Sequence, residues 1–266
     1  LKNAAGVENL WTSTGRGGDG AGYYSMRGFS VQPQLVNGLP GLTNGTINPA
    51  NIERIEVLKG PSATLFGNAV SSYGGLINVV TKKPYVGSGG ELSFTSGTYG
   101  LNQITGDFNT AINKSENLYF RLNTSYSTEQ SFQDAGFRKS FFVAPSLSYK
   151  VNNKLSFSFY GEITQAQQTN PTFLFLNRAA PTESKNLEEL NYNNKLSFTS
   201  NDLSLENPTQ NYRIEMDYKL SDTWQSQTLL SKSSTSTKGY YSYLYDYGIL
   251  GNDTFTRFIN KQNANT

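Results

Sequence analysis

Apolar and polar residues alternate with a period of two over long segments of the chain after residue 90. The pattern lies within 104–112, 118–126, 155–163 and 212–220. In the second of these, Leu118, Phe120, Leu122, Thr124 and Tyr126 alternate with Tyr119, Arg121, Asn123 and Ser125. Successive side chains of a β-strand point to opposite faces, so the pattern predicts antiparallel strands and no consecutive long helices.

The expected strands are long. We place about seven of them, at 90–97, 101–112, 117–129, 139–150, 154–167, 209–220 and 223–245. Most have about 11–14 residues, whereas strands of globular proteins usually have about 5–6. Tight turns at 113–116, 152–153 and 221–222 alternate with longer connections at 131–138 and 169–208. Short turns on one side and long loops on the other are typical of transmembrane β-barrels, in which the short turns are periplasmic.

A soluble β-sandwich also produces alternating strands, and it is the main structural alternative. Its inward faces should be apolar. One face of 212–220 instead carries Arg213, Glu215, Asp217 and Lys219. Charges on that face are expected of strands that line a polar barrel lumen.

Composition supports the barrel and excludes several classes of function. The mean hydropathy is −0.50 although 13% of the residues are aromatic, and no apolar run reaches the about 18 residues of a transmembrane helix. The chain has no Cys and no His, which argues against disulfides, zinc sites and most hydrolases, including an outer-membrane lipase. A formal charge of +2 gives no basic field for nucleic acid. We therefore expect no catalytic residues, no metal ligands and no resident cofactor.

Residues 1–84 differ from the rest of the chain. Glycines at 15–20 predict a loop, and short strands are expected near 24–30, 52–59 and 76–80. A short helix is expected at 61–66, because Pro61 suits a first helical position and Gly67 suits a helix end. These elements predict a compact mixed α/β domain ahead of the barrel strands.

The motifs of this first region resemble the plug domain of TonB-dependent outer-membrane receptors. Residues 51–84, NIERIEVLKGPSATLFGNAVSSYGGLINVVTKKP, are similar to the block that closes the plug in that family. The SMRGFS segment at 25–30 resembles its IRGF-type motif, and Leu1–Val7 resembles an opening segment. Within the family, the resemblance is strongest to ferrichrome-type siderophore receptors.

The resemblance implies a plug at 1–84 inside a barrel that begins at 85–266 and has about 22 strands in full. It further implies active import of a ferric siderophore across the outer membrane of a Gram-negative bacterium. Iron would arrive already chelated, and the partners would be the TonB–ExbB–ExbD complex and outer-membrane lipid. We expect the TonB box before Leu1 and the other strands after Thr266. Uptake of another large nutrient, such as a glycan, a peptide or cobalamin, is the alternative within the same fold.

The resemblance also assigns roles to two basic residues. Arg27 and Lys59 occupy family positions whose side chains, usually both Arg, pair with carboxylates of the inner barrel wall. We expect this pair to lock the plug to the barrel, with carboxylates located after Thr266. Lys59 departs from Arg and loses bidentate geometry. The alternative is ordinary surface charge.

Candidate ligand contacts lie in both regions. Arg16 and Gln34 align with plug-apex positions that contact the ligand in the ferrichrome receptor, although a loop Arg is often simply solvated. Thr46 stands where that receptor has an aromatic contact. In the barrel region, aromatic residues gather at the end of the last expected strand and in the long loop. The candidates are Tyr240, Tyr241, Tyr243, Phe173 and Phe175. An aromatic girdle at the membrane interface is the alternative for the tyrosines, together with Tyr245 and Tyr247.

Overall fold

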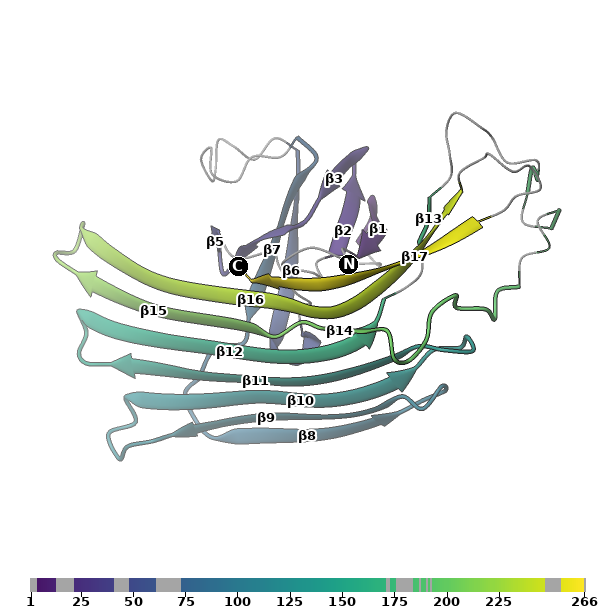
Figure 1. Cartoon of the computed structure of the whole chain (residues 1–266). Helices are drawn as coiled ribbons and strands as arrows, with labels where there is room; N and C mark the ends of the chain where they lie inside the picture. The colour runs from purple at the N-terminus through teal and green to yellow at the C-terminus, as the bar shows by residue number, and fades with distance from the viewer. Residues whose placement is uncertain are drawn as a thin grey trace.

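The computed structural model describes residues 4–12, 22–40, 48–60, 73–170, 173–175, 184–186, 188–189, 191, 193–246 and 255–265. These residues form three β-sheets and one short 3-10 helix (Figure 1). Two small sheets lie within residues 4–81, here called the plug region. The third sheet is large and curved, and is here called the wall. In the described part of the chain, no helix is long and apolar enough to cross a membrane.

The wall consists of ten strands, of which seven match the expected ones closely. They are β8 (Gly89–Ser96), β9 (Asn102–Ala111), β10 (Leu118–Gln130), β11 (Phe137–Lys150), β12 (Leu155–Thr169), β13 (Phe173–Phe175), β14 (Ser204–Glu206), β15 (Thr209–Lys219), β16 (Gln225–Asp246) and β17 (Phe255–Asn265). The long neighbours pair antiparallel in chain order from β8 to β12 and then through β15, β16 and β17. Among the described residues, β8 and β17 each pair with one strand only.

The sequence did not predict three of these strands. Residues 255–265 form β17 although 260–263 is wholly polar, because its pairing with β16 satisfies the backbone irrespective of the side chains. The short strands β13 and β14 form within the long 169–208 connection by pairing with β16. The turns at 113–116, 152–153 and 221–222 lie at one end of the wall and the longer connections lie at the other, as expected (Figure 1).

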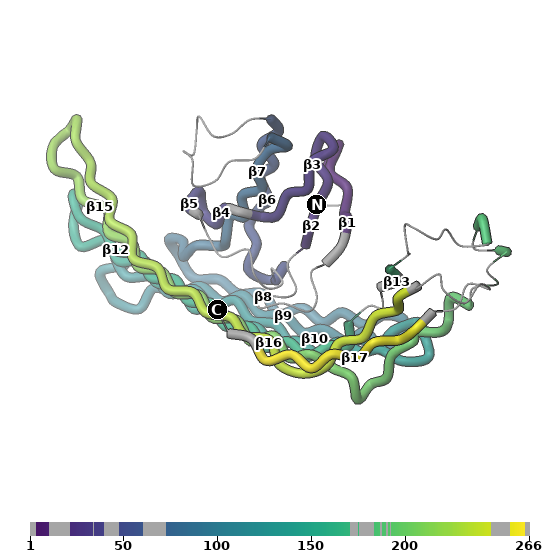
Figure 2. Tube along the Cα trace, turned by 45° about the horizontal axis from the view of Figure 1, so that its top comes forward, coloured from purple at the N-terminus to yellow at the C-terminus, as the bar shows by residue number. Residues whose placement is uncertain are grey.

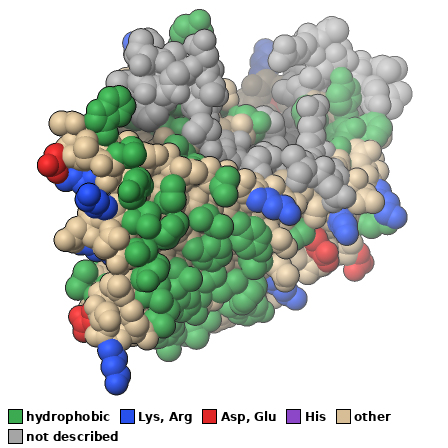
Figure 3. Space-filling view, turned by 90° about the vertical axis from the view of Figure 1, so that its left-hand side faces the viewer, with side chains coloured by type: hydrophobic (Ala, Val, Ile, Leu, Met, Phe, Trp, Pro, Cys, Tyr) green, Lys and Arg blue, Asp and Glu red, His purple; other side chains and the backbone are tan. Residues whose placement is uncertain are grey.

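The polarity of the two faces of the wall is the reverse of that in a soluble protein, with large apolar side chains exposed outside and polar side chains buried inside. The outer face exposes large apolar side chains, including Leu92, Phe94, Ile104, Phe108, Phe141, Phe157 and Ile214. Figure 3 shows such side chains gathered on the outer surface. The concave face, toward the plug region, buries polar side chains instead: Asn109, Asn123, Ser125 and Ser146. An apolar exterior around a polar interior is the arrangement of a transmembrane barrel, so the sandwich alternative is wrong.

The plug region lies inside the curve of the wall (Figure 2). Strands β1 (Val7–Thr12), β2 (Gly22–Met26) and β3 (Phe29–Val31) form one antiparallel sheet. The other sheet has the order β5-β4-β7-β6, with β4 (Pro33–Val36), β5 (Leu39–Pro40), β6 (Ile52–Lys59) and β7 (Gly75–Thr81). β6 and β7 fall where the sequence predicted strands. The helix expected at 61–66 lies outside the described residues.

A small apolar core joins the two sheets of the plug region. Val7, Met26, Val31 and Ile77 are almost fully buried in it and come from β1, β2, β3 and β7. The 3-10 helix η1 (Pro49–Asn51) precedes β6, and Asn48 caps it by accepting a hydrogen bond from the Ala50 N–H. This core is internal to the plug region, so polar groups are left to make the contacts with the wall.

Candidate functional site: a polar plug-wall interface and an aromatic cluster

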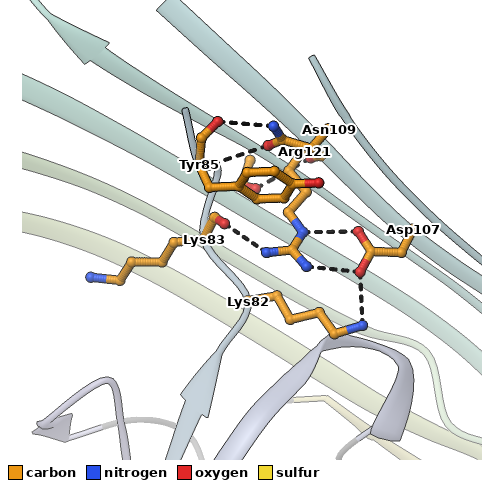
Figure 4. A network of polar contacts seen from close by, with 7 residues as sticks. Lys82, Lys83, Tyr85, Asp107, Asn109 and Arg121 are labelled. Atoms are coloured by element: carbon orange, nitrogen blue, oxygen red, sulfur yellow. Dashed lines mark hydrogen bonds and ion pairs between the residues drawn. The ribbon is translucent and has the colours of Figure 1, made fainter. Parts of the chain in front are cut away.

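An ion network fastens the end of the plug region to the wall (Figure 4). Asp107 on β9 and Arg121 on β10 face each other, and both guanidinium-to-carboxylate hydrogen bonds measure 2.8 Å. The Lys82 ammonium, one residue after β7, donates to the same carboxylate at 2.8 Å. The side chains of Arg121 and Asp107 are only 12% and 20% exposed. Bidentate pairing in such a half-dry site is strong and directional.

The backbone of the following segment, 83–87, is held by the same strands. Arg121 also donates to the Lys83 carbonyl at 2.8 Å, and its guanidinium lies 5.2 Å from the centre of the Tyr85 ring. Asn109 on β9 accepts from the Tyr85 N–H and donates to the carbonyls of Tyr85 and Gly87. Together with Lys82 and Asp107, these residues form the linker clasp. It fixes the chain where it passes from plug region to wall.

A second set of contacts joins η1 to the middle of the wall. The Asn48 amide donates to the Ser125 hydroxyl at 3.0 Å, and the Asn51 amide donates to the Tyr160 hydroxyl at 2.8 Å. Tyr160 in turn donates to the Glu162 carboxylate. Asn123 is fully buried. In the amide orientation that satisfies both of its ends, the Asn123 nitrogen donates at 3.2 Å to the Ala50 carbonyl and to Asp107. These contacts place neutral amides and hydroxyls between plug and wall, beside the buried Phe142 and Ala144 of β11.

One further wall residue reaches the plug region. Arg213 on β15 donates to the Val36 carbonyl of β4 at 3.0 Å. A cavity of about 100 Å³ lies beside it, between Thr81–Pro84 and strands β11, β12 and β15. Its walls include the hydroxyls of Ser146, Ser148 and Ser158. Arg213, one of the charges that argued against a sandwich, therefore contacts the plug region.

The plug region keeps a charged edge of its own. The Glu56 carboxylate accepts from the Asn78 amide at 2.7 Å and from Arg54 at 2.8 Å. These hydrogen bonds, the Asn78 one first, hold the pKa of Glu56 below its usual value. Glu56 is therefore ionised at neutral pH.

The predicted lock residues lie close together in the plug region. Arg27 is exposed, in the turn between β2 and β3, with a φ of 54°. A methyl group on Gly60, next to Lys59, would lie 3.4 Å from the Arg27 guanidinium. Neither residue forms an ion pair with any residue that the structure describes. Since the expected carboxylate partners lie after Thr266, the locking role stays a prediction.

The predicted ligand contacts are only partly within the described residues. Arg16 lies outside them, as does Thr46. Gln34 is part of β4 and Phe173 part of β13, but their side chains are not described. Phe175 is described and 49% exposed. The plug-apex contacts therefore stay predictions.

Aromatic residues gather where β13, β16 and β17 meet. Tyr243 on β16 lies 5.2 Å from Phe258 and 6.1 Å from Tyr241, with nearly parallel rings, and 5.5 Å from Phe175 edge-on. Phe175 also stacks on Tyr245 at 6.4 Å. Register pairs Ser231 with Arg213, so alternation puts the odd-numbered residues of β16 on the concave face. The aromatic cluster is thus Phe175, Tyr241, Tyr243, Tyr245 and Phe258.

Tyr240 is separated from the other tyrosines. It lies on the opposite face of β16, where Lys261 approaches its ring to 5.9 Å. Tyr240 is therefore in the position of a girdle residue, while Tyr241 and Tyr243 face the concave side. The sequence identified the aromatic residues of β16 and β13 as candidates but missed Phe258, because β17 itself was missed.

Sequence reasoning also missed the linker clasp. Alternation within 104–112 and 118–126 indicates that Asp107, Asn109 and Arg121 lie on the polar faces of their strands, but it does not show which of them meet. That depends on the register, which pairs Arg121 with Asn109 and Asn123 with Asp107. A basic pair, Lys82-Lys83, at the end of the plug motif was the available signal.

Comparison with known proteins matches the first part of the chain to a family. Residues 1–72 match the family model described as TonB-dependent Receptor Plug Domain. The metal-pseudopaline receptor of Pseudomonas aeruginosa is 32% identical over 119 residues, which are 45% of this chain and 16% of that protein. The ferrichrome outer membrane transporter/phage receptor of Escherichia coli K12 is 28% identical over 152 residues, 54% of this chain and 20% of that protein. The match thus spans a fifth or less of each of these relatives.

Solved structures show the same fold. The closed form of the ferric-catecholate import receptor of Escherichia coli K12 superposes with a TM-score of 0.77 at 18% identity, covering 97% of this chain and 38% of that one. The ferripyoverdine receptor of the Pseudomonas aeruginosa outer membrane, bound to ferripyoverdine, gives 0.76 at 18% identity, with 98% and 34% covered. At this identity the likeness establishes the architecture, a plug region within a barrel wall.

Proposed function

We propose that the chain belongs to the TonB-dependent outer-membrane receptors and is part of an active transporter for a ferric siderophore. The family consists of transporters and receptors rather than enzymes, and we infer no catalytic role. The site of action would be the outer membrane of a Gram-negative bacterium. Relatives named as ferrichrome, ferrioxamine and catecholate siderophore receptors support this class of ligand.

The observation that carries the proposal is the polar interface between plug and wall. An apolar interface would merge the plug with the barrel core and make its movement costly. The plug seen here is held instead by hydrogen bonds and one ion network, which water replaces when they open. Such a plug seals the lumen at rest and remains movable.

The energetics of iron capture explain why such a plug needs an outside energy source. A nanomolar site corresponds to about −12 kcal/mol. With a typical on-rate of about 10⁷ M⁻¹s⁻¹, its ligand leaves only about once in 100 s. Release into the periplasm therefore needs work, which the TonB–ExbB–ExbD complex would supply by pulling on the plug.

We assign the ligand-facing role to the aromatic cluster together with the plug-apex residues Arg16 and Gln34. Tyrosine rings provide a flat apolar face and a hydroxyl donor, a combination suited to organic chelates. In the described ranges, no group of acidic residues could hold a bare metal ion. Delivery of iron as a chelate is part of the proposal. Arg27 and Lys59 would complete the hold on the plug through the remaining wall.

Growth on defined iron sources tests the proposal. A strain deleted for this receptor is grown on single iron chelates, including a hydroxamate, a catecholate and a mixed-ligand siderophore. We expect growth to fail on at least one chelate and to return when the receptor is restored. Normal growth of the deletion strain on every chelate would contradict the proposal, provided that no other receptor in the strain imports them.

A second candidate follows from the metal-pseudopaline receptor relative, which is 32% identical in the matched region. Its name specifies a metal chelate rather than a ferric one, so chelates of metals other than iron belong in the same panel. Dependence on the receptor for a chelated metal other than iron would favour this candidate.

A further inference from the structure

The edge of β16 that faces β13 and β14 changes its partner strand within a few residues. β14 pairs antiparallel with Lys238–Gly239, and β13 pairs parallel with Tyr243–Tyr245. Among the described residues, no strand pairs with 240–242 on this edge, although β17 covers the other edge throughout. Backbone groups in this interval need another partner if they are buried.

A single side chain provides that partner. Asn170, the residue directly after β12, donates from its amide nitrogen to the Ser242 carbonyl at 2.8 Å. Its amide oxygen accepts from the Ser242 N–H at 3.0 Å. Asn170 is 2% exposed and Ser242 is fully buried. A carboxamide offers one donor edge and one acceptor edge, so Asn170 replaces one residue of a missing strand.

A glycine makes the neighbouring half of the junction possible. Gly239 has a φ of 122°, and a Cβ there would lie 2.1 Å from the Ser204 carbonyl oxygen of β14. Only glycine allows β14 to approach this closely. Along this edge of β16, pairing with β14 therefore stops at Gly239 and pairing with β13 begins at Tyr243. The Asn170 side chain pairs with Ser242 between them.

The junction lies at the base of the aromatic cluster. Ser242 stands between Tyr241 and Tyr243 in the chain, and the two rings stack on the opposite face from its own side chain. Phe175 reaches Tyr243 and Tyr245 because β13 is in register with these residues. The loop that carries Phe175 leaves the sheet at Asn170 itself. One residue thus sets both the departure of the loop and the backbone beneath the tyrosines.

We propose that Asn170 is a positioning residue for ligand capture, which holds Tyr241, Tyr243 and Phe175 in one aromatic surface for an organic metal chelate. This inference rests on the proposed function, because it assumes that the aromatic cluster contacts the ligand. Removing the Asn170 amide leaves a buried N–H and C=O of Ser242 unpaired, so the local backbone shifts toward water. The rings then lose their common surface although none of them is changed.

The chain offers a matched control residue. Asn207 is 5% exposed and also contacts β16, but its amide donates to the Thr237 hydroxyl at 3.0 Å rather than to the backbone. Asn207→Asp therefore introduces the same chemical change at an equally buried site near the junction. It leaves the backbone pairing of β16 intact.

The experiment compares Asn170→Asp, Asn170→Leu and Asn207→Asp in the intact receptor. Asn170→Asp keeps the acceptor and loses the donor, while Asn170→Leu loses both. Affinity is measured for ferrichrome, ferric ferrioxamine and a ferric tris-catecholate, and barrel folding is followed by heat-dependent gel mobility. Tryptic cleavage after Lys185 and Lys195, which are exposed in the loop, is timed on whole cells.

For each chelate that the parent binds, we expect Kd to rise at least tenfold in Asn170→Asp and further in Asn170→Leu. Loop cleavage should accelerate several-fold while the barrel mobility stays unchanged, and Asn207→Asp should behave like the parent. Parent-like affinity in both Asn170 variants, or an equal loss in Asn207→Asp, overturns the proposal. A parent that binds none of the chelates contradicts the proposed function instead. Loop cleavage alone then decides whether Asn170 positions the loop.

Discussion

The two ends of the lumen face are built from different chemistry. Near the short turns, the linker clasp holds the plug region with ions and amides, centred on Asp107 and Arg121. Near the long loops, the aromatic cluster centred on Tyr243 makes no ion pair among the described residues. Directional polar contacts suit fastening, since they exist only in one geometry. Aromatic surfaces suit capture, since they tolerate varied ligands. We therefore expect the linker clasp to hold the plug and the aromatic cluster to bind the ligand.

The largest effect is expected from Asp107→Asn in the linker clasp. It leaves Arg121 and Lys82 close together without their carboxylate. Loss of one partner of a buried pair costs about 3–5 kcal/mol, and partial exposure reduces this to about 2–3 kcal/mol. The plug should loosen, and antibiotics too large for porins should enter cells more readily.

The measurement for this variant is antibiotic susceptibility, together with chelate affinity. Glu91→Gln on β8 serves as a control, because Glu91 is exposed and forms no ion pair among the described residues. Unchanged permeability in Asp107→Asn would show that the clasp does not hold the plug. A lower chelate affinity in Asp107→Asn would show that the linker clasp also contributes to ligand binding.

A smaller effect is expected from Arg27→Ala, in the turn between β2 and β3. Arg27 is exposed and forms no ion pair among the described residues, and the resemblance places its partners in the remaining wall. A wet pair of this kind contributes about 1–2 kcal/mol. Permeability should rise less than in Asp107→Asn, and barrel melting should stay the same. If permeability and transport both match the parent, Arg27 is only a surface charge.

Tyr243→Ala should have the converse phenotype. It removes the ring that contacts Tyr241, Phe175 and Phe258, and ring pairs contribute about 0.5–1.5 kcal/mol beyond area burial. We expect chelate Kd to rise about tenfold with no change in permeability. Tyr240→Ala, on the other face, should leave Kd unchanged. Equal losses from the two variants would mean that the tyrosines act as a girdle.

The smallest effect concerns acid sensitivity of the loops. Asp134, between β10 and β11, accepts from the Ser197 hydroxyl at 2.7 Å and from its N–H at 2.8 Å. These bonds, the hydroxyl one first, lower the pKa of Asp134. A lowered pKa gives stability that is present above the ordinary Asp pKa of about 3.9 and is lost as pH falls through the folded value.

Protease protection of the 193–203 segment should therefore stay constant from pH 7 down to about 4 and fall only below that. Asp134→Asn should remove this acid dependence, since an amide does not titrate in this range. Loss of protection between pH 7 and 5 in the parent would show that another group controls the docking of the loop.

The sequence predicted the elements better than their junctions. Period-two alternation located seven wall strands within a few residues, because burial of one face dominates their side-chain pattern. It missed β17, whose polar side chains carry no pattern and whose order comes from pairing with β16. The plug strands β6 and β7 were found because Ile55, Val57 and the apolar run of β7 mark a covered sheet.

The candidate site was predicted in part. Tyr241 and Tyr243 were identified from aromatic density, but their separation from Tyr240 required a known inward face. The linker clasp was not predicted, because the pairing of Asp107 with Arg121 depends on strand register, which residue types do not fix. Asn170 carried no signal at all, since its role comes from where β13 and β14 meet β16.

The most direct test of a movable plug in an energised importer is uptake of a radio-iron chelate by cells with and without TonB, using a chelate whose use depends on this receptor. We predict that both strains bind the chelate with equal affinity and that only cells with TonB accumulate iron. Asp107→Asn should preserve binding while changing the rate of accumulation. Equal accumulation without TonB, in the presence of the intact receptor, would contradict the account.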